Sequence, residues 1–246
     1  MLTVGSLFSG IGGIELGLEW TGGFKTTWQV EIDEYARRVL EKHWPNVQRF
    51  ADIKECGASN LVPVDLICGG FPCQDISDAG LRAGLTAARS GLWGAMAGAI
   101  RVVRPRYALV ENVAAILHRG MGTVLGDLAA LGHDAEWDCL PTAAFGARHI
   151  RDRVFITSAS QEVDKPEGFL SWSKRRHPKA VRRWMQNAGI GRCLGGRPWS
   201  LESGVARTAY GVSCGLDRRR CLGNAVVPQV ARYIGERILE HARRAT

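Results

Sequence analysis

Short apolar runs alternate along the chain with segments whose apolar residues recur every three or four positions. The runs rich in β-branched residues predict strands at 2–8, 26–32, 64–68, 106–113 and 153–159, and a short strand ending near 51–53. Helical periodicity lies between them, at 14–20, 33–43, 92–104 and 121–131. Strands that alternate with helices in this way are typical of an α/β domain with a mainly parallel sheet.

The pattern changes after residue 159. Residues 160–206 show no clear period and few aliphatic side chains, but they contain three Trp and the basic run KRRH. We interpret this segment as a small loop-rich insert. Residues 207–246 then contain a Gly-Asn turn followed by an amphipathic helix.

Positive charge is concentrated in one part of the chain. The net charge is +8, but residues 165–220 hold 13 Lys/Arg against 3 Asp/Glu, a net of +10, which leaves −2 for the remainder. A segment of this kind favours a polyanionic partner, with a solvated basic face as the alternative.

Other features of the composition argue against whole classes of protein. No uncharged apolar run reaches the roughly 18 residues of a transmembrane helix. The apolar beginning lacks a basic leader and carries Glu15, so it predicts a strand and a helix, not a signal peptide. The seven Cys form no CxxC and the six His no HxxxH or HExxH, so zinc is poorly supported. An odd number of Cys without a secretory signal indicates free thiols in the cytoplasm.

The stretch FSGIGGIELG, residues 8–17, predicts a strand end, a glycine-rich turn and a helix. Its glycines would let a ligand approach the backbone at the helix N-terminus. Glu31 ends the next strand, where a carboxylate can bind two ribose hydroxyls, and Asp52 ends the third, where it can receive an adenine amino group. Together they predict a nucleoside cofactor. The alternative is a tight turn without a ligand, and the GxGG spacing weakens a pyrophosphate interpretation.

Two polar groups follow neighbouring buried strands. Cys73 lies in GGFPCQ and Glu111 in ENV. A lone thiol is a nucleophile, a metal ligand or, most commonly, a small buried hydrophobe, a role that suits Cys68 better. A carboxylate at a strand end is either structural or catalytic. A thiol and a carboxylate that emerge together beside a nucleoside site favour catalysis.

Arg151 and Arg153 stand at positions i and i+2, so they share one face of an extended segment. Paired guanidiniums suit a phosphate, a base carbonyl or a carboxylate, and an ion pair with nearby acids is the alternative.

The order FSGIGG, Glu31, Asp52, GGFPCQ, ENV, RxR and GNAVVP resembles the DNA (cytosine-5)-methyltransferase family, over nearly the whole chain except about 160–206. The resemblance implies an α/β, Rossmann-like methyltransferase fold with a mostly parallel sheet and helices on both faces. It divides the chain into a catalytic, cofactor-binding domain (1–159), a loop-rich target-recognition region (160–206) and a segment (207–246) that returns to the catalytic domain. The compact form is similar to enzymes encoded by phages or prophages.

The resemblance also implies a cofactor, S-adenosyl-L-methionine, and roles for single residues. Cys73 would attack carbon 6 of a flipped cytosine, Glu111 would bind its N3/N4 edge and Arg153 its O2, with Arg151 completing the RxR pair. The implied cofactor-binding residues are Phe8, Gly10, Ile11, Gly12, Gly13, Glu31, Ile32, Asp52, Ile53, Pro72, Leu92, Asn224 and Val226. The implied DNA contacts are Gln74, Ser77, Arg82 and Arg89 in a loop at 74–91, and Lys174, Arg175 and Arg176 in the insert.

The partner expected on this basis is double-stranded DNA, with no membrane and no metal. We expect a monomer, and any cognate restriction endonuclease would need no physical contact with it. A tRNA cytosine-5 methyltransferase on the same scaffold would share Cys73 and Glu111. A nicotinamide-dependent oxidoreductase would explain the glycines but gives no use for PCQ or ENV, and a catalytically silent DNA-binding module would not need them. His149 stands where the family usually has Gln.

Overall fold

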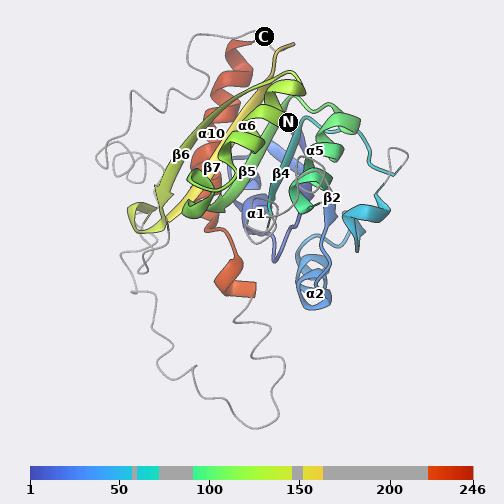
Figure 1. Cartoon of the computed structure of the whole chain (residues 1–246). Helices are drawn as coiled ribbons and strands as arrows, with labels where there is room; N and C mark the ends of the chain where they lie inside the picture. Colours follow the sequence, from blue (N-terminus) through green and yellow to red (C-terminus); the bar gives the residue numbers. More distant parts are fainter. Residues whose placement is uncertain (57–59, 72–90, 146–151, 163–220, 246) are drawn as a thin grey trace.

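The computed structural model describes residues 1–56, 60–71, 91–145, 152–162 and 221–245 (Figure 1). Its strands are β1 (Leu2–Leu7), β2 (Phe24–Val30), β3 (Gln48–Phe50), β4 (Leu66–Gly70), β5 (Tyr107–Val113), β6 (His133–Pro141) and β7 (Asp152–Ser160). Its helices are α1 (Gly13–Glu19), α2 (Glu34–His43), α5 (Leu92–Val103), α6 (Met121–Ala130) and α10 (Pro228–Arg244), with short 3-10 turns η1 (Ile53–Glu55), η2 (Ala114–Leu117) and η3 (Thr142–Phe145).

The described strands form one sheet in the order β3-β2-β1-β4-β5-β7-β6. Strands β1 to β5 run parallel, whereas β7 is antiparallel to both β5 and β6. The order reverses between β1 and β4, since the chain moves outward to β3 and then returns to the other side of β1. In open α/β sheets, ligands bind at the carboxyl ends of the strands beside such a reversal.

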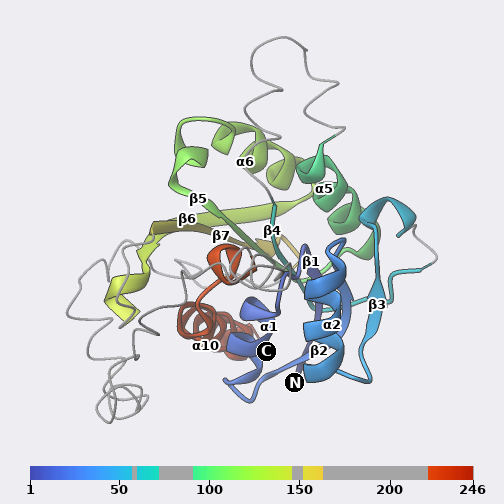
Figure 2. The ribbon, with the colours of Figure 1, turned by 90° about the horizontal axis from the view of Figure 1, so that it is seen from below.

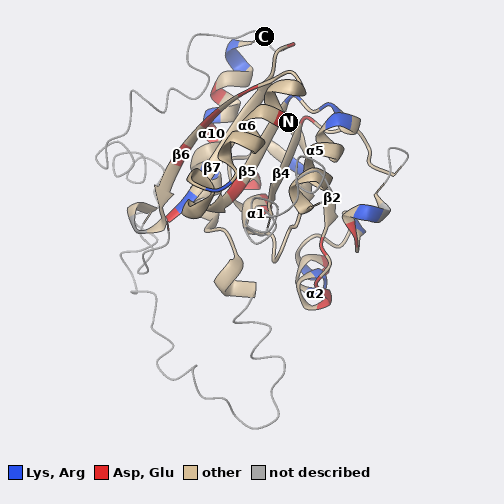
Figure 3. Cartoon of the chain, viewed as in Figure 1, with Lys and Arg blue, Asp and Glu red and all other residues tan. Residues whose placement is uncertain are grey.

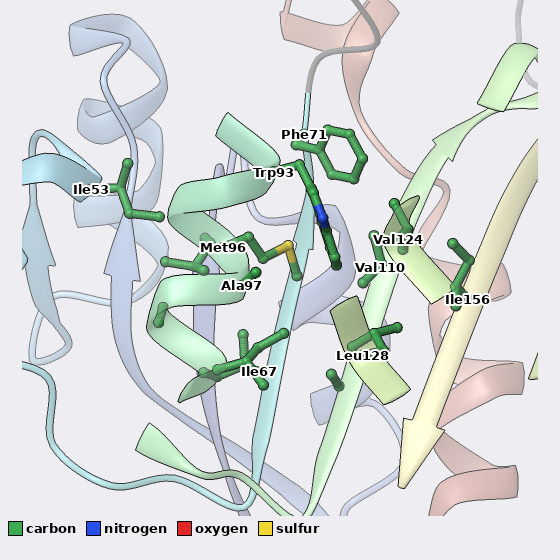
Figure 4. Packing of buried hydrophobic residues seen from close by; sticks show 14 of the residues in the cluster. Ile53, Ile67, Phe71, Trp93, Met96, Ala97, Val110, Val124, Leu128 and Ile156 are labelled. Atoms are coloured by element: carbon green, nitrogen blue, oxygen red, sulfur yellow. The ribbon is translucent and has the colours of Figure 1, made fainter. Parts of the chain in front are cut away.

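Helices cover both faces of the sheet, as the sequence predicts. Helices α1 and α10 lie on one face and α5 and α6 on the other (Figure 2). Side chains alternate along each strand, so in β4 Leu66 and Cys68 join the core under α1 and α10, while Ile67 joins the opposite core. Figure 4 shows that second core, in which residues of α5 and α6 pack onto the strands. The labelled contributors are Ile53, Ile67, Phe71, Trp93, Met96, Ala97, Val110, Val124, Leu128 and Ile156.

Helix α10 packs along α1 although more than 200 residues separate them in sequence. Glycines permit the approach, because a Cβ on Gly17 would lie 2.2 Å from the carbonyl oxygen of Pro228. At the other end of α10, a Cβ on Gly23 would lie 2.4 Å from Leu239. The chain after residue 220 is therefore built into the same layered unit as β1.

Predicted and observed elements differ in four respects. Strand β2 ends at Val30 instead of residue 32, and β3 ends at Phe50, so Asp52 instead caps the 3-10 turn η1. Strand β6 is absent from the prediction, because this edge strand buries few side chains and shows weak alternation. The residues of β7 also give no indication that this strand runs antiparallel to β5.

Charges on the described helices are balanced locally. Figure 3 shows basic and acidic residues close together on α2 and α10, where Arg38 pairs with Glu34, Arg232 with Glu236 and Arg237 with Glu240. The basic segment 165–220 lies entirely outside the described residues. In the described ranges no helix is long and apolar enough to cross a membrane.

Candidate active site

A cavity of about 740 Å³ opens at the carboxyl ends of β1, β2, β4 and β5. Its volume is in the range of sites that hold nucleotides and other small ligands. The residues predicted from the sequence that line it are Phe8, Gly10, Gly13, Glu31, Ile32, Asp52, Ile53, Leu92, Glu111, Arg153, Asn224 and Val226. The structure thus brings together residues from both ends of the chain.

The turn between β1 and α1 has a left-handed backbone, with positive φ at Phe8, Gly10 and Gly12. A Cβ on Gly12 would lie 2.4 Å from the ring of Trp44, so this glycine meets both a conformational and a packing requirement. Ile11 and Gly12 are not among the described residues that line the cavity. Gly12 therefore supports the turn, whereas Gly10 and Gly13 line the cavity.

Glu31 joins two turns through its carboxylate. Oε2 accepts a hydrogen bond from the backbone N–H of Gly10 at 2.7 Å, and Oε1 accepts one from the N–H of Asp33 at 2.8 Å. A carboxylate can accept about four hydrogen bonds, so it can also bind the two hydroxyls of a ribose. The two backbone donors hold it in one orientation at the cavity wall.

Beyond Glu31, the cavity offers an apolar and a polar group to a planar ring. The side chain of Ile32 is 74% exposed at the cavity edge, and Ile53 is buried in its wall. Asp52 accepts a hydrogen bond from the N–H of Lys54 at 2.9 Å, which fixes its carboxylate beside them. This end of the cavity has the groups that an adenine would require.

Glu111 and Arg153 form an ion pair in the same cavity. Arg153 Nε lies 2.9 Å from Glu111 Oε1, and both side chains are mostly buried. Glu111 pairs with Gly70 across β4 and β5, and a Cβ on Gly70 would lie 2.5 Å from Glu111 Oε2. Gly70 therefore makes room for the carboxylate, a role that was not predicted from the sequence.

Asn112, the middle residue of ENV, ties β5 to the chain that leads toward Cys73. Its Nδ2 donates to the carbonyl oxygen of Phe71 at 2.9 Å, and its Oδ1 accepts from the N–H of Val113 at 2.8 Å. Asn112 is only 2% exposed, so these bonds satisfy a buried amide. The role of Asn112, unlike that of its neighbour Glu111, was not predicted from the ENV motif. The polar Asn within an apolar strand was the available signal.

Several predicted residues lie outside the described ranges, so their roles stay predictions. They are Pro72, Cys73, Gln74, Ser77, Arg82, Arg89, Arg151, Lys174, Arg175 and Arg176. Another thiol, Cys68, is fully buried in β4, and burial, reinforced by the nearby Glu15 carboxylate, raises its pKa well above the ordinary range. A thiol that stays protonated in this way serves packing. The described residues contain no cluster of His, Cys, Asp and Glu suited to a metal.

The residues that line the cavity could hold an adenine nucleoside with an attached amino-acid chain. Carboxylates and aliphatic side chains line the cavity, and Glu31 is hydrogen-bonded to the glycine turn. There the carbonyl oxygen of Val226 would lie 2.2 Å from a Cβ on Gly13, so backbone forms this wall. Such a wall suits a ligand that approaches main-chain groups closely.

Comparison with known proteins agrees with this geometry. The family model described as C-5 cytosine-specific DNA methylase matches residues 2–204. Type II methyltransferase M2.BsuMI of Bacillus subtilis (strain 168) is 37% identical over 172 residues, which cover 67% of this chain and 43% of that protein. Type II methyltransferase M.NgoBI of Neisseria gonorrhoeae is 34% identical over 161 residues, covering 64% and 50%. The chain thus spans half or less of the length of these relatives.

Solved structures show the same fold. A DNMT2 mutant of Spodoptera frugiperda matches with a TM-score of 0.66 at 14% identity, covering 97% of this chain and 100% of that one. The similarity of fold confirms the Rossmann-like arrangement predicted from the sequence. From the match of the family model to most of its length, the chain belongs to the C-5 cytosine-specific DNA methylase family.

Proposed function

We propose that the protein transfers a methyl group from S-adenosyl-L-methionine to carbon 5 of cytosine in double-stranded DNA. The observation that carries the proposal is the Glu111–Arg153 ion pair, which lines the same cavity as Glu31 and Asp52, the carboxylates proposed to bind the nucleoside. A base held by the pair would lie beside the cofactor. Family membership supports the choice of cytosine and of carbon 5.

The cofactor would be held by residues from both ends of the chain. Glu31 would bind the ribose, Ile32 and Asp52 the adenine, and Asn224 and Val226 the opposite side. Phe8, Gly10 and Gly13 would surround the amino-acid part. When bound, S-adenosyl-L-methionine supplies a methyl group made electrophilic by the adjacent sulfonium.

The protein's part in the chemistry is to make carbon 5 nucleophilic. The Cys73 thiolate would add to carbon 6 and form a C–S bond, which turns the ring into an enamine. Glu111 would hold the N3/N4 edge and Arg153 the O2, so that charge developing on the ring is compensated. After methylation, loss of the carbon-5 proton to a base would break the C–S bond and return the thiolate.

The ion pair prepares Glu111 for this role. Because Arg153 binds Oε1 at 2.9 Å and Gly70 lets the carboxylate lie against the strand, its orientation is set before a base arrives. Groups fixed in advance avoid reorganisation during the reaction. Carbon 6 is hidden inside a duplex, so the cytosine would have to be flipped into the cavity.

DNA binding is proposed for parts of the chain beyond the described ranges. Gln74, Ser77, Arg82 and Arg89 would contact DNA near the flipped base, and Lys174, Arg175 and Arg176 would contact it from the basic segment. A segment with a net charge of +10 should bind DNA with steep salt dependence.

The test is incorporation of tritiated methyl groups from S-adenosyl-L-methionine into duplex DNA or tRNA. We expect label in DNA, and covalent trapping of the protein on DNA that contains 5-fluorocytosine, which cannot lose its carbon-5 substituent. Cys73→Ser should abolish both while cofactor binding persists. Label in tRNA alone would assign another substrate, and full activity of Cys73→Ser would refute the covalent mechanism.

A further inference from the structure

The corner between β2 and α2 carries three consecutive cavity residues, Glu31, Ile32 and Asp33. All three follow the end of β2 at Val30, so the sheet alone does not fix their backbone. Glu31 N–H still donates to the carbonyl oxygen of Phe50 at 3.1 Å. The carbonyl groups of the corner need donors from elsewhere.

Arg37, in the first turns of α2, supplies a donor to two of these carbonyls. Its Nη1 lies 2.9 Å from the carbonyl oxygen of Glu31 and 2.6 Å from that of Ile32. One guanidinium nitrogen thus bridges consecutive peptide groups. Hydrogen bonds from a charged donor are stronger than neutral ones, so the corner is held more firmly than an ordinary turn.

The position of Arg37 needs an explanation beyond helix stability. A cation near the N-terminus of a helix opposes the helix dipole, where an acidic residue would be favourable. The next residue, Arg38, is exposed and forms an ordinary ion pair with Glu34 at 3.4 Å. Of these two adjacent arginines, only Arg37 forms hydrogen bonds to the corner that lines the cavity.

The corner in turn orients the groups that face the cavity. The Glu31 carboxylate accepts its two hydrogen bonds from Gly10 and from Asp33, so a rotation of the peptide groups at 31–33 would move it. The same rotation would move the exposed Ile32 side chain. Arg37 thus acts on both the ribose-binding and the adenine-binding groups without lining the cavity itself.

We propose that Arg37 is a positioning residue that sets the affinity of the protein for the nucleoside half of its methyl donor. The inference rests on the proposed function, because it takes the cavity to bind S-adenosyl-L-methionine. A binding site whose groups are held in place loses less entropy when the ligand binds. Removal of the guanidinium should therefore weaken binding of the nucleoside and leave the later chemistry unchanged.

The experiment compares R37M, R37K and the matched control R38M in the full chain. Isothermal titration would give Kd for S-adenosyl-L-methionine and for 5′-methylthioadenosine, which keeps the nucleoside but lacks the amino-acid part. We expect R37M to weaken both by about tenfold, since it loses two charge-assisted hydrogen bonds. R37K should fall between R37M and wild type, because an ammonium donates without the planar geometry of a guanidinium. R38M should bind both as wild type does.

Kinetics and stability separate positioning from a purely structural role. In R37M, KM for S-adenosyl-L-methionine should rise while kcat and KM for DNA remain within about twofold of wild type. Urea unfolding of the ligand-free variants should show that each is fully folded under the conditions of the titrations. If R37M does not fold, R37Q replaces it with the same expected loss, because its shorter side chain cannot bridge both carbonyls.

The outcomes distinguish the two proposals. Wild-type protein that does not bind S-adenosyl-L-methionine would overturn the proposed function. Wild-type binding of both ligands by R37M, or by R37Q in its place, would overturn the role of Arg37 and leave the function standing. Weakened binding of S-adenosyl-L-methionine with unchanged binding of 5′-methylthioadenosine would also overturn it, since the corner would then not act on the nucleoside.

Discussion

Replacement of Gly70 by Ala tests whether the position of the Glu111 carboxylate controls the reaction. The new Cβ would lie 2.5 Å from Glu111 Oε2, about 0.9 Å closer than the 3.4 Å at which ordinary contacts begin. The atom in its way is the end of a side chain, so the fold can accommodate Ala by moving the carboxylate. That movement of nearly 1 Å would also disturb the 2.9 Å contact with Arg153.

A catalytic group misplaced by about 1 Å costs on the order of 100-fold in rate, or about 2.7 kcal/mol of activation free energy. We expect G70A to lose about that much in single-turnover methylation of DNA. Binding of S-adenosyl-L-methionine should change only slightly, because its proposed contacts lie elsewhere in the cavity.

The control is Gly126→Ala in α6, where no atom lies within 4 Å of the new Cβ. Alanine is the better helix former, so this variant should gain roughly 0.5–1 kcal/mol of stability and keep its activity. A G70A rate within about threefold of wild type, measured on folded protein, would refute the argument that Gly70 positions Glu111.

Three further predictions concern buried polar groups. Asn112→Ala should lower the free energy of unfolding in urea by about 1–3 kcal/mol, because it leaves the Phe71 carbonyl without its donor. It should also slow methylation more than it weakens cofactor binding. An unchanged unfolding midpoint would contradict this prediction. Cys68 should resist a thiol reagent at about pH 8 until the protein unfolds, since burial raises its pKa, and rapid labelling of the native protein would contradict this. Burial lowers the pKa of His133 below its ordinary value of 6.5, so the unfolded chain takes up its proton first as pH falls. The free energy of unfolding should therefore decrease as pH falls from about 6.5 toward the folded-state pKa of His133. The decrease should be smaller in H133Q. If urea unfolding shows the same pH dependence for H133Q and wild type, His133 is excluded as a cause.

The core of the fold was predictable because its strands are covered on both faces. Tyr107 and Leu109 face α10 while Ala108 and Val110 face α5 and α6, so the first four residues of β5 form an unbroken apolar run. Strand β6 has a neighbour on one edge only and carries polar residues on much of its surface. Its assignment depends on pairing with β7, which local sequence does not encode.

Some candidate site residues were likewise predictable from the local sequence, and others were not. Glu31 and Asp52 could be found because acidic residues near strand ends, at suitable spacing from a glycine turn, have a known use. Gly70 and Arg37 could not, since one acts by lacking a Cβ and the other by reaching backbone carbonyls around a corner. Such roles depend on distances in the folded structure and leave no characteristic spacing of residues in the sequence.

The packing of α10 bears on the order in which the segments of this fold can be joined. Leu239 of α10 lies against Gly23, and the carbonyl oxygen of Gly23 accepts a hydrogen bond from the N–H of Leu2 at 2.8 Å. The last turns of α10 and the first residue of β1 are therefore near neighbours. A circular permutant in which residues 221–245 precede β1 through a short linker can keep the contacts of Val226 with Gly13 and of Pro228 with Gly17. The part of the cavity wall formed by Cys221 and by Asn224 to Val226, just before α10, thus depends on the proximity of α10 to β1 and α1, and not on the direction from which the chain reaches it.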